Sequence, residues 1–129
     1  MTRKEKNGEM LLYIYTVTYK KKGQSDFTVI CDKNTKEVRE TPKLYITVDN
    51  TCFLHTYSSS IKKSDLGQVI ENDSYMSKNG HEPLYTVILA EDDIEKASKI
   101  LKDFVNRKID NLMAQVKLQA QIVTELEDN

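Results

Sequence analysis

The sequence is poor in the residues that glycine-rich and cysteine-based sites require. It has no tryptophan, two prolines, four glycines, two cysteines and two histidines among 129 residues. Four scattered glycines build neither a Walker-type phosphate loop nor a dinucleotide fingerprint. Two cysteines do not make the disulfide framework of a small secreted domain. Because Cys31 and Cys52 each stand in an apolar run, we expect both to be buried free thiols.

Long hydrophobic runs are also missing. No apolar stretch approaches the ~18–20 residues that cross a bilayer. The segment Met10–Val17 alternates with tyrosine and threonine and lacks a cleavage site, so it predicts a strand and not a signal peptide. The net charge of −1 offers no general attraction for nucleic acid. We therefore expect one cytoplasmic domain of 129 residues without membrane association, for which nucleic acid is an unfavoured partner.

Over residues 10–90, apolar and polar residues alternate with a period of two. This alternation predicts an antiparallel sheet of six or seven strands after a flexible N-terminus of residues 1–9. The expected strands are Leu12–Tyr19, Phe27–Cys31, Lys36–Thr41, Leu44–Val48, Cys52–Tyr57, Val69–Met76 and Leu84–Leu89.

Turn residues separate these strands. Lys20–Ser25 predicts a hairpin loop, Asp32–Thr35 a turn, and Ser77–His81 a loop built on Asn-Gly. Residues 62–67 predict a connection with one helical turn. Pro42 predicts that the strand before it lies near an edge, whereas the nearly continuous apolar strand Leu84–Leu89 is expected inside the sheet.

The remaining residues, 91–127, predict one long amphipathic helix, which makes the fold class α+β. Glu91, Asp92 and Asp93 place negative charge at the helix start, and neither proline nor glycine follows. Apolar residues recur every eleven positions, as in Leu101, Leu112 and Val123, so their stripe runs almost straight along the helix.

This helix is too long for the sheet that precedes it. Some 35 residues span ~50 Å, whereas a β-region of ~90 residues is a body only ~30 Å across. The distal part therefore projects, and its exposed stripe predicts a partner helix from a second copy. The expected self-association residues are Ile109, Leu112, Val116, Ala120, Val123 and Leu126.

Residues for catalysis or metal binding are sparse. Cys52 and His55 have half the spacing of a zinc site, but alternation along a strand points them to opposite faces. Asp49, Asp65 and Glu71 resemble the carboxylates of a nuclease only in type, because turns carry such residues anyway. We expect a protein that is not an enzyme and that has neither a metal nor a cofactor.

Two features are candidates for ligand binding. Tyr13, Tyr15 and Tyr19 share one strand face and could stack on a base; the alternative is that they cover the sheet beneath the helix. Asn106 and Arg107 interrupt the apolar pattern of the helix, and the arginine fork suits phosphate or carboxylate; the alternative is a solvated helix face.

Three segments carry a resemblance. Lys36–Tyr45, Ile61–Gly67 and Leu89–Asp93 resemble small proteins of phages and prophages, often built as a β-meander with a long C-terminal helix. The layout is also similar to the Thoeris-inhibiting nucleotide sponges of phages. That resemblance implies an oligomer that sequesters a cyclic ADP-ribose-type signal, although it supplies no matching ligand residues.

Together these observations predict a phage-type anti-defence protein that forms homo-oligomers and binds a small nucleotide at a subunit boundary. Tyr13, Tyr15 and Tyr19 would stack on the base, and Arg39 and Arg107 would neutralise phosphate, with Asn106 beside them. The first alternative is an anti-defence or regulatory protein that inhibits a host immune protein by direct contact. The second is a nucleic-acid-associated accessory protein.

Overall fold

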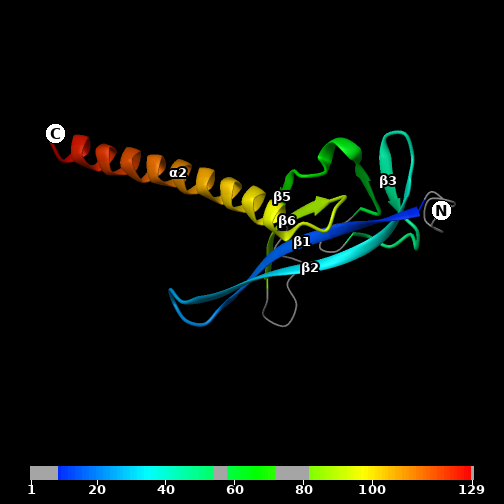
Figure 1. Cartoon of the computed structure of the whole chain (residues 1–129). Helices are drawn as coiled ribbons and strands as arrows, with labels where there is room; N and C mark the ends of the chain where they lie inside the picture. Colours follow the sequence, from blue (N-terminus) through cyan, green and yellow to red (C-terminus); the bar gives the residue numbers. More distant parts are fainter. Residues whose placement is uncertain (1–8, 54–57, 72–81, 129) are drawn as a thin grey trace.

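A computed structural model describes residues 9–53, 58–71 and 82–128. Six antiparallel strands form one curled sheet, and a single long helix follows them (Figure 1). The α+β class predicted from the sequence is therefore confirmed. The elements are β1 (Glu9–Lys21), β2 (Phe27–Glu40), β3 (Leu44–Thr47), β4 (Ser60–Lys62), the 3₁₀ turn η1 (Lys63–Asp65), β5 (Val69–Glu71), β6 (Glu82–Leu89) and α2 (Ile94–Glu127).

The strand order is β4-β3-β2-β1-β6-β5, so the two edge strands are β4 and β5. Only the short connection through η1 separates these edges along the chain, which requires the sheet to curl until they approach each other. Gly67, at φ +79°, ends this connection by donating its backbone N–H to the carbonyl of Ile88 at 2.9 Å. The left-handed backbone there is one that glycine adopts without steric cost.

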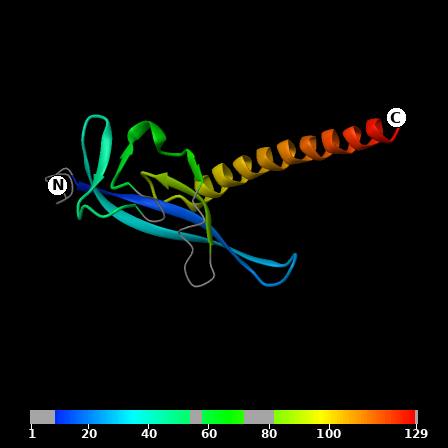
Figure 2. The same cartoon turned by 180° about the vertical axis from the view of Figure 1, so that it is seen from behind.

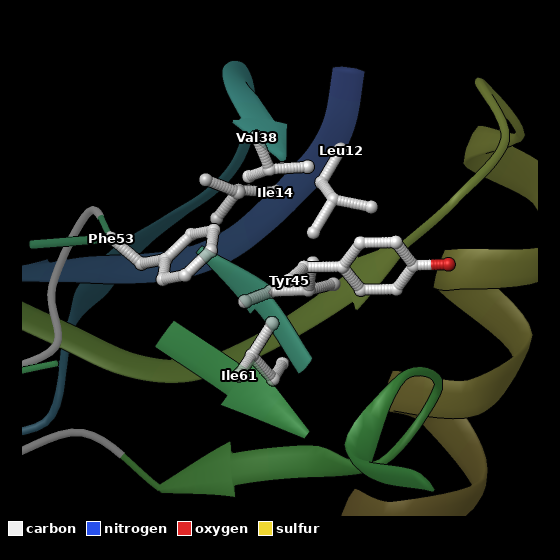
Figure 3. Close-up of a cluster of buried hydrophobic side chains, with 7 residues drawn as sticks. Leu12, Ile14, Val38, Tyr45, Phe53 and Ile61 are labelled. Carbon is white, nitrogen blue, oxygen red and sulfur yellow. The ribbon is translucent and has the colours of Figure 1, made fainter. Parts of the chain in front are cut away.

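Alternation along β1 divides the core between the two faces of the sheet. Leu12 and Ile14 point to the concave side, where they pack with Val38, Tyr45 and other apolar side chains from β3, β4 and β6. Figure 3 shows these side chains pointing toward one another from separate strands. The alternation predicted for β1 thus places apolar side chains in two cores, one on each face of the sheet.

The second core lies on the opposite face of the sheet and includes Tyr15. With Val87 and Leu89 of β6, this tyrosine packs against Ala97 and Leu101 of the helix. Only the first third of α2 therefore rests on the sheet, and the rest continues away from it, as both views show (Figures 1 and 2). This agrees with the expectation that the distal part of the helix projects beyond the sheet.

The structure corrects the prediction for β2. Asp32–Thr35 was expected as a turn between two short strands, but the strand is continuous from Phe27 to Glu40. Its central residues pair in register with β1, where Asp32 lies opposite Thr16 and Thr35 opposite Tyr13. Thirteen consecutive pairings along β1 outweigh the local turn preference of four polar residues.

The partner of β3 was also predicted wrongly. Ser60–Lys62 pairs with β3, and not the expected strand Cys52–Tyr57, of which Phe53 belongs to a connection and 54–57 lie outside the described residues. Pro42 does not mark an edge either, since β2 pairs with β1 on one side and with β3 on the other. The helical turn in 62–67 and the interior position of β6 are confirmed.

Both cysteines are exposed free thiols, which contradicts the prediction that they are buried. Cys31 lies on β2 opposite Val17, where β3 no longer runs alongside, and Cys52 follows the β3 turn. The predicted Asn-Gly loop at 77–81, most of the strand Val69–Met76 beyond Glu71, and residues 1–8 of the N-terminus lie outside the described residues.

Candidate functional site

The start of α2 is held by a small polar cluster. Asp93 caps the helix by accepting the Lys96 backbone N–H at 3.0 Å. The Tyr15 hydroxyl accepts the Asp93 backbone N–H at 2.8 Å and donates to the Asp92 carboxylate at 3.4 Å. Lys33 Nζ lies 3.0 Å from the same carboxylate. A carboxylate cap is favoured there by the positive end of the helix dipole.

Titration in this cluster follows from its surroundings. Burial raises the pKa of Tyr15, and the nearby negative charge of Asp92 adds to the increase. The hydrogen bond to Asp92 raises the pKa of Lys33. The arrangement therefore keeps Tyr15 neutral and Lys33 charged, which suits a structural clamp and not a proton-transferring pair.

A second set of contacts marks where the helix leaves the sheet. The rings of Phe104 and Tyr85 meet edge to face with centroids 5.3 Å apart. Lys108 Nζ lies 5.7 Å from the Phe104 ring centroid and 3.0 Å from the Glu71 carboxylate on β5. Beyond Lys108, every described residue of α2 is exposed.

The projecting segment 109–127 carries a broad apolar surface. Its large apolar side chains are 41% to 68% exposed in the single chain. They are Ile109, Leu112, Met113, Val116, Leu118, Ile122, Val123 and Leu126. Three of the eight were not in the predicted stripe: Met113 and Ile122 widen it, and Leu118 lies on the opposite side of the helix.

The residues predicted to bind a ligand are not gathered at one point of the chain. Tyr15 is fully buried beneath the helix start, which favours the alternative that it covers the sheet. Tyr13 packs at the margin of the same core, and Tyr19 meets the Phe27 ring edge to face at 5.8 Å. Neither Tyr13 nor Tyr19 is fully buried.

The predicted polar residues are exposed but separate. Arg39 lies near the end of β2, opposite Ile46 of β3, far along the strand from the hairpin loop. Asn106 and Arg107 lie on α2 just beyond Phe104, which packs on Tyr85 of β6, and Figure 1 shows α2 leaving the sheet away from β3. A common ligand for Arg39 and Arg107 would therefore need more than one copy of the chain.

The structure reveals a cavity that the sequence did not indicate. It has a volume of about 510 Å³ and opens where edge strands β4 and β5 approach each other. Apolar side chains from five separate segments line it, namely Leu44, Phe53, Ile61, Val69, Ile70 and Ile88. Its polar lining is Ser58, Ser60, Lys62, Asp65 and Gln68. This size and mixed lining are typical of small-molecule sites.

The rim of this cavity is basic on one side. An adjoining hollow shares Leu44 and Lys62 with it and is also lined by Lys43 and Lys63. Lys63 is engaged, because it contacts the Glu40 carboxylate and lies 5.4 Å from the Tyr45 ring centroid. Lys43 and Lys62 are exposed. The sequence did show the Lys62-Lys63 pair, but not the apolar cavity beside it.

Two negative findings apply to the residues that the structure describes. Among them, no group of three or more His, Cys, Asp or Glu side chains could hold a metal ion. No helix in the described ranges is long and apolar enough to cross a membrane. Comparison with protein-family models, curated proteins and solved structures finds no match to this chain.

Proposed function

We propose that this chain is a non-enzymatic binding protein of the phage anti-defence type, which self-associates through segment 109–127 and sequesters a small nucleotide immune signal. The observation that carries the binding part is the cavity of about 510 Å³ between β4 and β5, with lysines at its rim. The resemblance to nucleotide sponges supplies the class of ligand.

The cavity suits an amphiphilic anion. Phe53, Ile61 and Ile70 offer apolar surface to a base, and Ser58, Ser60 and Gln68 offer hydrogen bonds to its edges. Lys62 and Lys43 offer positive charge to a phosphate group. Neither hydrolysis nor group transfer follows from this set, and sequestration needs only binding.

Self-association is supported by the energy of burial. A fully buried Leu, Ile, Val or Met contributes ~1.5–3 kcal/mol, so covering side chains that are about half exposed contributes ~1 kcal/mol each. Seven such side chains share one broad face of segment 109–127, so covering all of them in both copies would contribute ~14 kcal/mol, an upper bound for pairing. Association costs ~4–15 kcal/mol, which is of the same order as this contribution.

The test is a melting series of the full chain with a panel of cyclic nucleotides, cyclic ADP-ribose isomers included. A ligand that binds only the native state at 100 times its Kd adds ~2.7 kcal/mol of stability. We expect a melting shift with one member of the panel. Lys62→Glu should abolish the shift, and Lys102→Glu, an exposed helix lysine, should retain it. A panel without any shift contradicts the proposal.

A second candidate function is direct inhibition of a host immune protein, and one observation favours it. Within the described residues, β3 pairs only with Val38–Glu40 of β2, so the outer edge of β2 from Phe27 to Lys36 has no strand beside it. A free edge accepts an extended strand from another protein. Capture of one host protein that Val29→Pro abolishes, without any nucleotide shift, would favour this function over sequestration.

A further inference from the structure

The β1–β2 hairpin projects from the sheet as an arm, here defined as residues 17–31. Within the described residues, the last pairing of β6 with β1 is Tyr19 with Glu82, and beyond it the described strands of the arm are β1 and β2 alone. One face of the arm is mostly apolar: it carries Val17, Tyr19, Phe27, Val29 and Cys31, with Lys21 at its tip end. Phe27 is 50% and Val29 64% exposed, so this face is largely uncovered in the single chain.

The arm and the helix diverge. Both leave the body of the sheet in the same general direction, and the distance between them grows toward their ends (Figures 1 and 2). The apolar face of the arm continues the sheet face on which Ala97 and Leu101 rest. One chain therefore carries two uncovered apolar surfaces, one on the arm and one on segment 109–127.

The ends of these two projections carry opposite charge. The arm tip contains Lys20, Lys21 and Lys22. The helix end contains Glu125, Glu127 and Asp128, and its last turn has no basic residue. The partial negative charge of the helix C-terminus adds to these carboxylates. The acidic helix end is thus electrostatically complementary to the arm tip.

The apolar face of the helix is also wider than a helix pair needs. At 3.6 residues per turn, the side chains from Ile122 through Leu126, Leu112 and Val116 to Met113 cover about 180° of its circumference. A two-helix seam covers a narrower stripe. One partner helix would leave a flank uncovered, so a second apolar surface is required beside it.

We propose that in the homodimer the C-terminal end of one helix lies on the apolar face of the other copy's arm, and the reverse. The inference rests on the self-association in the proposed function and adds the surface that completes it. A two-fold axis makes the exchange reciprocal, so both helix ends and both arms are covered at once. A second copy is the occupant because it supplies the complementary charge and apolar surface together.

Chain lengths are consistent with antiparallel helices. From Phe104, level with Tyr85, the helix extends ~36 Å to Asp128. From Val17, paired with Tyr85, the arm extends ~17 Å to its tip. When the two helices overlap over about 13 residues, from Val116 onward, the acidic end of one helix is level, along the helix direction, with the lysines of the other copy's arm.

The test is a charge exchange in the full chain, followed by sedimentation equilibrium at low salt. The arm variant K20E/K21E/K22E should raise the dimer Kd at least tenfold, and so should the helix variant E125K/E127K/D128K. The six substitutions together should restore the Kd to within about threefold of the unmodified chain. A control with the same change in net charge, K96E/K99E/K102E on the exposed face of the proximal helix, should leave the Kd unchanged.

A covalent readout locates the contact. In a Cys31→Ser/Cys52→Ser background, Leu126→Cys and Ser25→Cys together should form an intermolecular disulfide under mild oxidation, because Ser25 lies at the arm tip and a disulfide requires Cα atoms within ~7 Å. The same background with Leu126→Cys alone should lose that cross-linked species.

The outcomes separate this inference from the proposed function. A monomeric unmodified chain refutes self-association itself, and the inference with it. A dimer that Val116→Asp dissociates but the arm variant leaves intact refutes the helix-on-arm contact alone. Failure of the six combined substitutions to restore the dimer also refutes it. Nucleotide binding is measured by the melting series and is independent of these results.

Discussion

Removal of one hydroxyl group should loosen the attachment of the long helix to the sheet. In Tyr15→Phe, the ring stays in the core with Val87, Leu89 and Ala97, because its shape is almost unchanged. The Asp93 backbone N–H loses the acceptor that lies at 2.8 Å, and the Asp92 carboxylate loses a donor at 3.4 Å. The substitution thus isolates the polar contacts from the packing.

The expected loss of stability is about 2 kcal/mol. A hydrogen bond contributes ~0.5–1.5 kcal/mol net, and a partly buried N–H left without its acceptor costs ~1–3 kcal/mol. The 3.4 Å contact to Asp92 is long and adds little. For a domain of 129 residues, each kcal/mol lowers Tm by ~3–4 °C, so Tm should fall by about 7 °C.

The assay is urea denaturation followed by circular dichroism, at constant chain concentration because association shifts the midpoint. Tyr13→Phe is the matched control, since it removes the same group from a half-buried tyrosine on the same face of β1. It should change stability by less than ~0.5 kcal/mol. If Tyr15→Phe were equally mild, the hydroxyl clamp would not hold the helix start.

The ionisation of Tyr15 should also lower the stability of the folded protein at alkaline pH. Because burial raises the pKa of Tyr15, its neutral form is retained in the native state at pH values where an unfolded tyrosine, near pH 10, has ionised. The stability it contributes is therefore present below pH 10 and is lost as pH rises above that value. Lys33, with its pKa raised by Asp92, acts in the same direction. Tyr15→Phe should thus reduce the alkaline slope without abolishing it.

Three further predictions concern the helix cap, a turn and a connection. Asp93→Ala should cost ~1 kcal/mol in urea denaturation because the Lys96 N–H loses its cap, whereas Asp93→Asn keeps an acceptor and should cost little. Hydrogen bonds from Thr51 lower the pKa of Asp49 to about 2. The stability that Asp49 contributes is therefore present above pH 4 and is lost as pH falls through 2. An NMR titration should show this pKa in the unmodified chain and a higher pKa in Thr51→Val. Gly67→Ala should destabilise by ~1–2 kcal/mol through its backbone conformation at φ +79°, since open space surrounds the added methyl group; an unchanged urea midpoint would contradict this.

The features that the sequence alone determined depend on neighbours along the chain. The helix is one, because an acidic cap, a repeat of eleven residues and the absence of proline and glycine over 34 positions are local properties. The hairpin loop after β1 is another, closed by a 2.8 Å bond from the Lys22 N–H to the Asp26 carbonyl. Helix length relative to the sheet was enough to predict the projecting segment.

Only the tertiary structure decided what depends on residues far apart in sequence. Pairing with β1 kept Asp32–Thr35 extended, against the local preference of those residues for a turn. The curl of the sheet brought β4 and β5 together and created a cavity whose lining comes from positions 44 to 88. The tertiary structure also left the apolar face of the arm uncovered at Phe27 and Val29, which alternation along the strands could not indicate. Burial is a property of the assembled chain, so a local pattern specifies which face is apolar but not what covers it.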